Sequence, residues 1–248
     1  MKQLFCIVIL AAGLIGCVSE ITVENTANPS DKVLPVNMGH VKIYFVQTDD
    51  GYILVDTGMP DEDGRLDEAF TAADIDPQEV QLIVITHAHP DHSGTVAYAK
   101  EITDAKILCH ESAASYIRVG RCSPIIAQNF KGKFMNAVSP EWEYEGVEPD
   151  ILVKREFDLG EYGIKGKVVH TPGHTEDSVT IILDNGEMLL GDLVRGKEPK
   201  IHLGQFYEDE AVLLQSLEMI AGFDAEKIYM SHGEYIDNVA LQRTIDKL

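Results

Sequence analysis

Apolar residues along the chain follow two spacings, one typical of strands and the other typical of helices. Short apolar runs rich in β-branched residues predict strands at 41–46, 52–55, 81–86, 106–109, 153–158, 164–169, 178–184, 187–191 and 228–230. Apolar residues three and four apart predict helices at 63–74, 94–102, 208–221 and 237–247. Two strand-rich halves with helices between them predict an α/β fold, in which two sheets pack face to face and helices cover them outside.

The first 37 residues follow neither spacing. Lys2 precedes an apolar run from Leu4 to Gly16, which is shorter than the roughly 20 residues of a membrane span. Cys17 follows directly, as in a lipoprotein signal, so we expect residues 1–17 to be a signal peptide and Cys17 to be lipidated. An ordinary signal peptide or an uncleaved anchor is the alternative. Residues 18–37 are polar and predict a tether, which leaves 38–248 as the domain. We therefore expect a prokaryotic, extracytoplasmic protein held at the membrane by its lipid.

The charge of the chain limits its possible partners, and its cysteines limit its possible disulfide bonds. The chain has 20 Lys and Arg residues against 41 Asp and Glu residues, a formal net charge of −21. Such a chain repels phosphate backbones, so we expect no nucleic-acid partner. Only Cys109 and Cys122 fall within the domain. Outside the cytoplasm these two can pair, and two separate thiols are the alternative.

Residues 87–92 hold the densest group of potential metal ligands. His87, His89, Asp91 and His92 fall within six residues of a chain that has nine histidines in all. The side chains of alternate residues in an extended segment point the same way, so His87 and His89 can bind one ion. The turn at Pro90 re-aims Asp91 and His92 toward a second ion. Imidazole nitrogen and carboxylate oxygen are ligands that suit zinc.

Three more polar residues end apolar strands or tight turns later in the chain. His174 follows a Thr-Pro-Gly turn, Asp192 follows the run Leu-Leu-Gly, and His232 lies between Ser231 and Gly233. Polar side chains at such positions are well placed for a site on the rim of a sheet.

With these three residues in order after the motif, the sequence resembles the metallo-β-lactamase superfamily over residues 38–235. The resemblance implies an αββα four-layer sandwich, with two mixed β-sheets flanked by helices. It also implies two Zn²⁺ ions, with Fe or Mn as alternative metals. His87, His89 and His174 would hold the first ion, Asp91, His92 and His232 would hold the second, and Asp192 would bridge both. Asp56 would support the ligand loop from behind.

The other histidines lack this setting. His170 lies four residues before His174 and is expected to support the site or the core rather than to bind metal. His40, His110 and His202 are expected to be structural or on the surface, and His202 follows Asp192 closely enough to approach the pocket.

The resemblance implies a hydrolase that uses a hydroxide shared by two zinc ions on the carbonyl of a small ester, thioester or lactone. Asp91 would orient the hydroxide and accept its proton. Asp192 stands where many β-lactamases of this superfamily carry Cys or Ser, which disfavours β-lactamase activity without removing it. Two further alternatives are a mononuclear-iron enzyme similar to the sulfur dioxygenases and a non-enzymatic binding protein that retains the metals.

Residues 111–150 are long and irregular for a connection, which is typical of a lid or substrate loop. Its larger side chains are expected to line the pocket or to pack the lid onto the domain: Tyr116, Phe130, Phe134, Met135 and Trp142. Arg118, Arg121 and Arg195 are candidates to meet an anionic substrate, and simple solvation at the surface is the alternative for each.

Overall fold

The computed structural model describes residues 20–24, 28, 30–130, 132–134 and 142–248. The expected signal peptide and Cys17 lie outside the described residues, as does Met135 of the expected lid. Within the described part of the chain, no helix combines the length and apolar character needed to cross a membrane.

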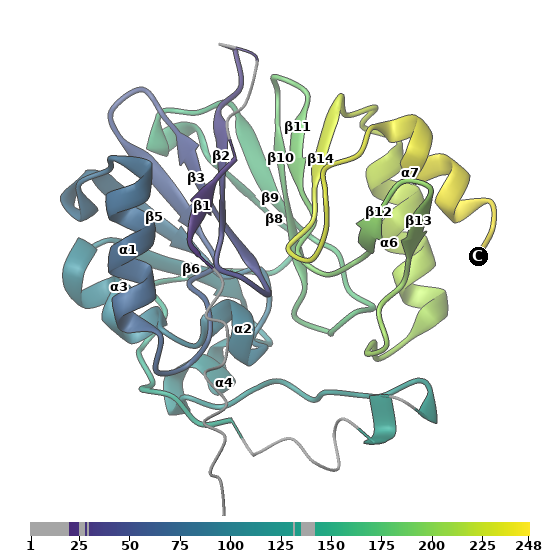
Figure 1. The fold of residues 1–248 in the computed structure, drawn as a ribbon, viewed down its shortest axis with the longest axis horizontal. Coiled ribbons are helices and arrows are strands. Elements are labelled where there is room, and N and C mark those ends of the chain that lie inside the picture. Colours follow the sequence, from purple (N-terminus) through teal and green to yellow (C-terminus); the bar gives the residue numbers. More distant parts are fainter. Residues whose placement is uncertain (1–19, 25–27, 29, 131, 135–141) are drawn as a thin grey trace, which may run out of the picture.

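Two mixed sheets form the centre of the molecule (Figure 1). The seven-stranded sheet runs in chain order through β1 (Thr22–Val23), β2 (Val33–Asn37), β3 (Lys42–Gln47), β4 (Tyr52–Val55), β5 (Val80–Val84), β6 (Lys106–His110) and β7 (Ile151–Val153). The five-stranded sheet has the order β14 (Lys227–Tyr229), β11 (Glu187–Leu189), β10 (Val179–Leu183), β9 (Gly166–His170) and β8 (Glu156–Asp158). A separate hairpin pairs β12 (Arg195–Lys197) with β13 (Lys200–His202).

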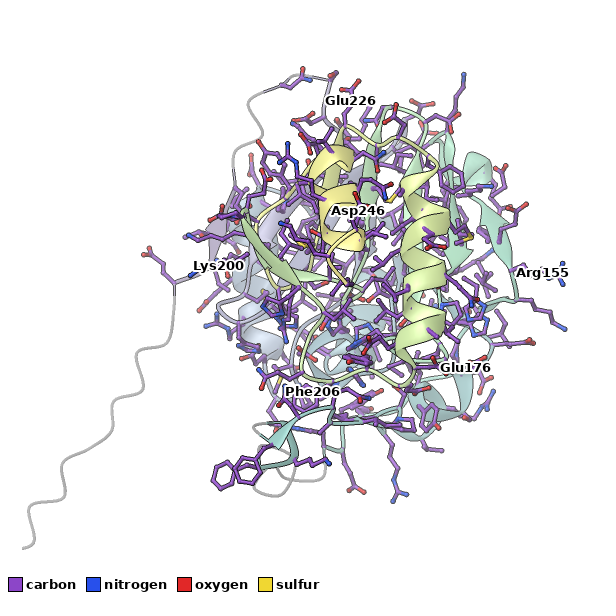
Figure 2. The ribbon with its side chains drawn as sticks, turned by 90° about the vertical axis from the view of Figure 1, so that its right-hand side faces the viewer. Arg155, Glu176, Lys200, Phe206, Glu226 and Asp246 are labelled. Carbon is purple, nitrogen blue, oxygen red and sulfur yellow. The ribbon has the colours of Figure 1, made fainter. Side chains whose placement is uncertain are left out.

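Helices cover the outer face of each sheet (Figures 1 and 2). The first half supplies α1 (Asp63–Ala73), α2 (Pro90–Ser93), α3 (Val96–Thr103) and α4 (Ala114–Val119), and the second half supplies α6 (Glu210–Ala221) and α7 (Asn238–Ile245). The predicted αββα sandwich is therefore confirmed.

The apolar runs of the strands are continuous because both faces of each sheet are buried. In β3, Ile43 and Phe45 pack against α1 and α3, while Tyr44 and Val46 face the second sheet. A third core lies between the five-stranded sheet and helices α6 and α7, where Met188 meets Leu213 and Leu241. Three apolar layers thus separate four layers of secondary structure.

Two expectations from the sequence are wrong in detail. Residues 22–23 and 33–37, expected to belong to the tether, are strands of the first sheet, because Val33 and Val36 are buried in its two faces. The single strand expected at 153–158 is two strands, β7 and β8, which belong to different sheets. The chain crosses between the sheets at the exposed residues Lys154 and Arg155.

The two cysteines of the domain are free thiols in this structure. Cys109 is buried within β6. Cys122 is partly exposed, and its Sγ lies 3.6 Å from the carbonyl oxygen of Trp142. The alternative of two separate thiols is the one that the structure adopts.

Candidate metal centre

The seven residues expected to bind metal converge at one edge of the sandwich. Strand β5 leads into the histidine motif, and β9, β11 and β14 lead into the loops of His174, Asp192 and His232. Their ligand atoms form three overlapping groups: His87, His89 and His174; His87, His92 and Asp192; and Asp91, His92 and His232. Residues separated by as many as 145 positions in the sequence thus meet in one place.

The first cluster is a triangle of ring nitrogens. Nε2 of His87 lies 3.1 Å from Nδ1 of His89, and Nε2 of His174 lies 3.2 Å from both. Ligands of a tetrahedral metal with bonds of ~2.0–2.1 Å are separated by about 3.3 Å, so the triangle has the size of one face of such a site.

Outer hydrogen bonds turn these nitrogens inward as acceptors. A carbonyl oxygen only accepts hydrogen bonds, so Nδ1 of His174, 2.9 Å from the carbonyl of Phe206, carries its hydrogen there. His89 presents Nε2 to the carbonyl of Pro124 in the same way, at 3.5 Å. Burial and the neighbouring histidines lower the pKa of His174 to about 3, and burial lowers the pKa of His87 and of His89. A histidine binds a metal ion through the lone pair of a neutral imidazole, and these rings are neutral and direct their lone pairs inward.

The second cluster contains charge. Nε2 of His232 lies 3.0 Å from Oδ2 of Asp91, and Nε2 of His92 lies 3.8 Å from the same oxygen. Burial acts to lower the pKa of His92, but Asp56, Asp91 and Asp192 outweigh it and raise the pKa to about 10. His232 also has a raised pKa, because Asp192 and Asp91 outweigh its burial. The nearby histidines hold the pKa of Asp91 well below its usual value despite burial.

Asp192 reaches both clusters. Its Oδ2 lies 3.3 Å from Nε2 of His232 and 3.9 Å from Nε2 of His174, and its Oδ1 lies 3.6 Å from Nε2 of His92. Oδ1 of Asp192 and Nε2 of His92 are buried, and neither has a hydrogen-bond partner in the described part of the chain. Leaving such atoms unpaired is costly, and a cation between them would satisfy both. The residues present therefore fit a metal centre, although their role as ligands stays a prediction.

Comparison with known proteins identifies the fold's family. The family model for the metallo-beta-lactamase superfamily matches residues 36–232. The chain belongs to this superfamily.

Several relatives share between a fifth and about a quarter of their aligned residues with this chain. The chain is 26% identical over 194 residues to the beta-lactamase-like protein 2 homolog of Drosophila melanogaster, covering 78% of this chain and 59% of the relative. It is 25% identical over 205 residues to an atrochrysone carboxyl ACP thioesterase of Passalora fulva, covering 80% of this chain and 50% of the relative. The chain thus spans between half and three fifths of the length of these two relatives. Among solved structures, the Rm3 metallo-beta-lactamase matches with a TM-score of 0.62 at 20% identity, over 82% of this chain and 76% of that one.

Asp56 supports the motif as the superfamily resemblance implied. Its carboxylate accepts hydrogen bonds from Nδ1 of His92 at 2.7 Å and from the backbone N–H and hydroxyl of Thr86, both at 2.8 Å. Its backbone has a φ of 61°, in the left-handed region that aspartate adopts more readily than most residues other than glycine.

A second supporting carboxylate escaped the sequence analysis. Asp177 is buried and its Oδ2 accepts a hydrogen bond of 2.8 Å from the backbone N–H of Ala88, between the first two histidines of the motif. Asp177 lies in the loop before β10 and follows Glu176, and an acidic pair in a loop gives no signal of a buried role in the sequence.

The remaining histidines lie outside the three ligand groups. His170 stacks on His110 at 3.8 Å and contacts the carbonyl of Glu176 at 2.7 Å, so it braces the loop of His174 and contacts no ligand. His40 contributes its backbone carbonyl, which accepts the Nδ1 hydrogen of His232 at 2.6 Å. His202 lines the cavity beside the centre, as its position after Asp192 indicated.

The expected lid touches the centre through its backbone. Residue 127 forms an isolated bridge with residue 206, so the segment that supplies the Pro124 carbonyl runs beside the segment that supplies the Phe206 carbonyl (Figure 2). Tyr116 packs on the first core, while Phe130 and Phe134 are 86% and 61% exposed and do not line the site. Arg118 and Arg121 form exposed ion pairs with Glu148 and Glu143.

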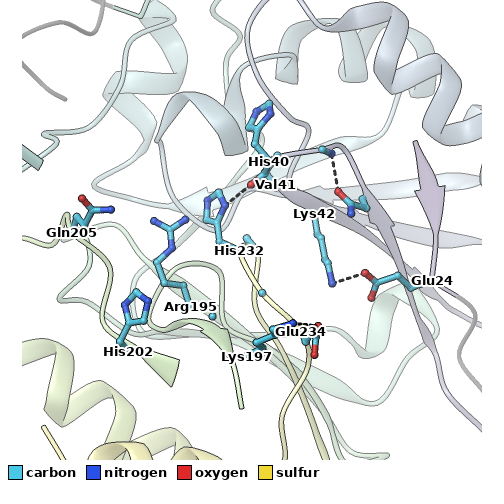
Figure 3. Close-up of a pocket in the computed structure, with 15 residues that line it drawn as sticks. Glu24, His40, Val41, Lys42, Arg195, Lys197, His202, Gln205, His232 and Glu234 are labelled. Carbon is cyan, nitrogen blue, oxygen red and sulfur yellow. Dashed lines mark hydrogen bonds and ion pairs between the residues drawn. The ribbon is translucent and has the colours of Figure 1, made fainter. Parts of the chain in front are cut away.

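A cavity of about 650 Å³ opens beside the second cluster (Figure 3). His232 forms part of its wall, and β12 and β13 form another part. Arg195, Gln205 and His202 face it from this side. A volume of this size suits a small molecule.

Proposed function

We propose that this protein is a hydrolase that uses two divalent cations, Zn²⁺ in the first instance, to cleave an ester, thioester or lactone-type carbonyl. The observation that carries this proposal is the position of Asp192. One carboxylate lies within 4 Å of ring nitrogens from both clusters, which supports a role as a ligand that two cations would share. A site for one cation would leave the second cluster without a reason for its unpaired buried atoms.

Two such cations, when bound, make water nucleophilic near neutral pH and polarise a carbonyl oxygen. The residues of the chain supply position and proton acceptance. Asp91 has a pKa held well below its usual value, so it remains an ionised acceptor that can orient a water molecule. The outward hydrogen bonds of His89, His174 and His232 hold the rings still, so that little reorganisation is needed during reaction.

Two comparisons with members of the superfamily support the substrate class. One relative is named as a thioesterase, which acts on a carbonyl joined to sulfur. The chain has Asp192 where many β-lactamases of the superfamily have Cys or Ser, so β-lactam hydrolysis is the weaker candidate. A one-iron dioxygenase would use the first cluster, and the presence of the second favours two cations.

The test is metal content combined with a panel of esters, thioesters, lactones and a β-lactam. Protein purified without added metal is analysed for Zn, Fe and Mn, and turnover is measured before and after Zn²⁺ is restored. We expect about two cations per chain and turnover of at least one carbonyl substrate. One iron per chain with no hydrolysis would overturn the proposal in favour of the dioxygenase. Unchanged ligand binding without turnover, and no effect of Asp91→Ala, would instead favour a binding protein.

We also propose that Cys17 carries a lipid that anchors the protein outside the cytoplasm. The apolar run that ends directly before Cys17 supports this. Lipoproteins of this type carry several acyl chains, and more than one is needed for stable anchoring. A Cys17→Ser variant should leave the membrane fraction and lose labelling by radioactive palmitate. Retention of both properties would contradict the anchor.

A further inference from the structure

Two large aromatic side chains face solvent on a part of the expected lid that we call the lid turn, residues 126–130 and 132–134. Phe130 is 86% exposed, the largest fraction among the exposed large apolar side chains of the described residues, and Phe134 is 61% exposed. They lie four positions apart in backbone that is helical at its described positions. Residues with this spacing share one face of a helix. Neighbouring exposed rings of this size are typical of a surface that binds a partner.

The backbone of the lid turn is fixed, so the exposure of the two rings does not come from a loose chain. The N–H of Tyr207 donates to the carbonyl of Ile126 at 3.1 Å, and the N–H of Gln128 donates to the carbonyl of Gln205 at 2.9 Å. A Cβ on Gly132 would lie 3.1 Å from the carbonyl oxygen of Gln205, so this glycine faces inward. The phenylalanines two positions before and after it are about 200° away around the helix, and they therefore face outward.

The lid turn lies at the edge of the molecule that holds the metal centre. Residue 127 forms a bridge with Phe206, whose carbonyl accepts the Nδ1 hydrogen of His174 at 2.9 Å. Figure 2 shows Phe206 toward one end of the molecule and Glu226 toward the opposite end. The two outward rings are therefore part of the metal-centre edge.

The N-terminal strand enters its sheet from the same edge. Thr22 of β1 pairs with Asn37 of β2, and Asn37 and Glu24 line the cavity beside the second cluster. The chain before Thr22 therefore approaches the sheet from the metal-centre edge. Cys17 lies five positions earlier, at most ~18 Å away along an extended chain. A domain of this size is about 45 Å across, so a lipid on Cys17 would hold this edge near the bilayer and keep the opposite edge away from it.

We propose that the metal-centre edge docks on the surface of the lipid bilayer, with Phe130 and Phe134 inserted among the lipids. This inference rests on the proposed lipid at Cys17 and is independent of the proposed reaction. Phenylalanine on the outer face of a helical turn is suited to the boundary between headgroups and acyl chains. The net charge of −21 disfavours both attraction to anionic lipids and association with a second copy of the chain, so the contact with the bilayer is apolar.

The test follows a tryptophan at each position in the purified full chain mixed with phosphatidylcholine vesicles. Trp142 is the single native tryptophan, so Trp142→Phe supplies a background without tryptophan emission. Phe130→Trp and Phe134→Trp place reporters on the lid turn. Phe223→Trp is the matched control, because Phe223 is also exposed and follows α6 at the end of the molecule opposite the metal centre. Mass spectrometry reports whether Cys17 carries a lipid.

We expect lipids brominated along their acyl chains to quench the emission of Phe130→Trp and Phe134→Trp by about half or more, and to leave Phe223→Trp nearly unchanged. In the Phe130→Trp protein, Phe134→Ser should lower the quenching about twofold or more, because it removes one of the two inserted rings. Lys133→Gln changes an exposed cation of the same turn and should leave the quenching as it was.

Each outcome separates the docking edge from the anchor. Absence of quenching at both positions in a chain with lipidated Cys17 overturns the docking edge and leaves the anchor intact. Equal quenching of Phe223→Trp overturns it as well, because the domain would then have no fixed face toward the bilayer. A loss in Lys133→Gln as large as that in Phe134→Ser contradicts apolar insertion. A chain without lipid on Cys17 that is still quenched at both positions refutes the anchor and supports docking, and one that is not quenched refutes both.

Discussion

The two candidate metal clusters share Asp192 but differ in what surrounds them. The first consists of three imidazoles whose outer hydrogen bonds go to neutral groups, among them the carbonyls of Pro124 and Phe206. The second contains Asp91, and Nδ1 of His92 forms a hydrogen bond of 2.7 Å with the side chain of Asp56. One cluster is a neutral nitrogen site, and the other is an anionic site.

This difference determines what each cluster does without a cation. The three imidazoles have lowered pKa values and stay neutral, so the first cluster presents lone pairs to an ion at once. In the second cluster the carboxylates raise the pKa of His92 and of His232, so protons occupy the place of the cation. A metal must displace those protons, and the two clusters should respond differently to mutation and to pH.

Loss of the first cluster should have the largest effect. His89→Ala removes one corner of the nitrogen triangle, and its weak 3.5 Å contact with Pro124 contributes little to folding. We expect bound metal to fall from about two ions per chain to about one, and kcat/KM to fall on the order of 10³-fold or more. The circular dichroism spectrum should be retained. His40→Ala removes an exposed imidazole outside the ligand groups and should keep the full metal content. Retained turnover in His89→Ala would contradict the assignment of the site.

A substitution behind the second cluster should have a smaller and more selective effect. Asp56→Asn preserves the shape of the side chain and tolerates the left-handed backbone, but its amide nitrogen cannot accept a hydrogen bond. The nitrogen therefore loses one of the three bonds from Thr86 and His92 if it replaces Oδ1, and two if it replaces Oδ2. We expect the free energy of unfolding to fall by about 1–3 kcal/mol. Metal affinity of the second cluster should fall about 10- to 100-fold, with the first cluster little changed.

Asp177 offers the matched control behind the first cluster. Its Oδ2 accepts a hydrogen bond from Ala88, and its Oδ1 has no hydrogen-bond partner among the residues that the structure describes. In Asp177→Asn the amide oxygen can keep the bond to Ala88, so both clusters should bind metal nearly as before. Chelator competition and denaturant titration of both variants measure these effects. An equal loss of metal affinity at both clusters in Asp56→Asn would mean that Asp56 positions the ligands of both clusters rather than those of the second alone.

The parts of this arrangement that the sequence predicted are those with a local signal. Strands buried on both faces leave continuous apolar runs, and ligands at the ends of such runs stand out as polar interruptions. The meeting of His174, Asp192 and His232 with the motif followed from the superfamily resemblance. The spacing of these residues along the chain does not show how close they lie to one another in space.

The features of the site and of the fold that could not be predicted from the sequence depend on contacts between segments that are distant along the chain. The carbonyls of Pro124 and Phe206 are backbone atoms and leave no trace in residue type. The chain leaves the first sheet after Val153, and that choice depends on which sheet edge is free.

The last expected difference between the clusters is in the pH dependence of their metal affinity. Because the pKa of His92 is raised to about 10, its ring is protonated at neutral pH in the metal-free protein, and a cation must displace that proton. Affinity of the second cluster should therefore rise with pH, by about tenfold per pH unit for each proton released, between about pH 6 and 9. The pKa of His174 is lowered to about 3, so the first cluster has no proton to release in this range, and its affinity should be nearly constant.

Two variants separate the clusters for this measurement. His89→Ala disables the first cluster, and Asp91→Asn removes the carboxylate that only the second contains. Chelator competition with Zn²⁺ at several pH values should then give a steep dependence in His89→Ala and a shallow one in Asp91→Asn. Equal slopes of affinity against pH in the two variants would show that Asp192 couples the clusters into one titrating unit. In that case a proton bound in one cluster would lower the metal affinity of both clusters equally.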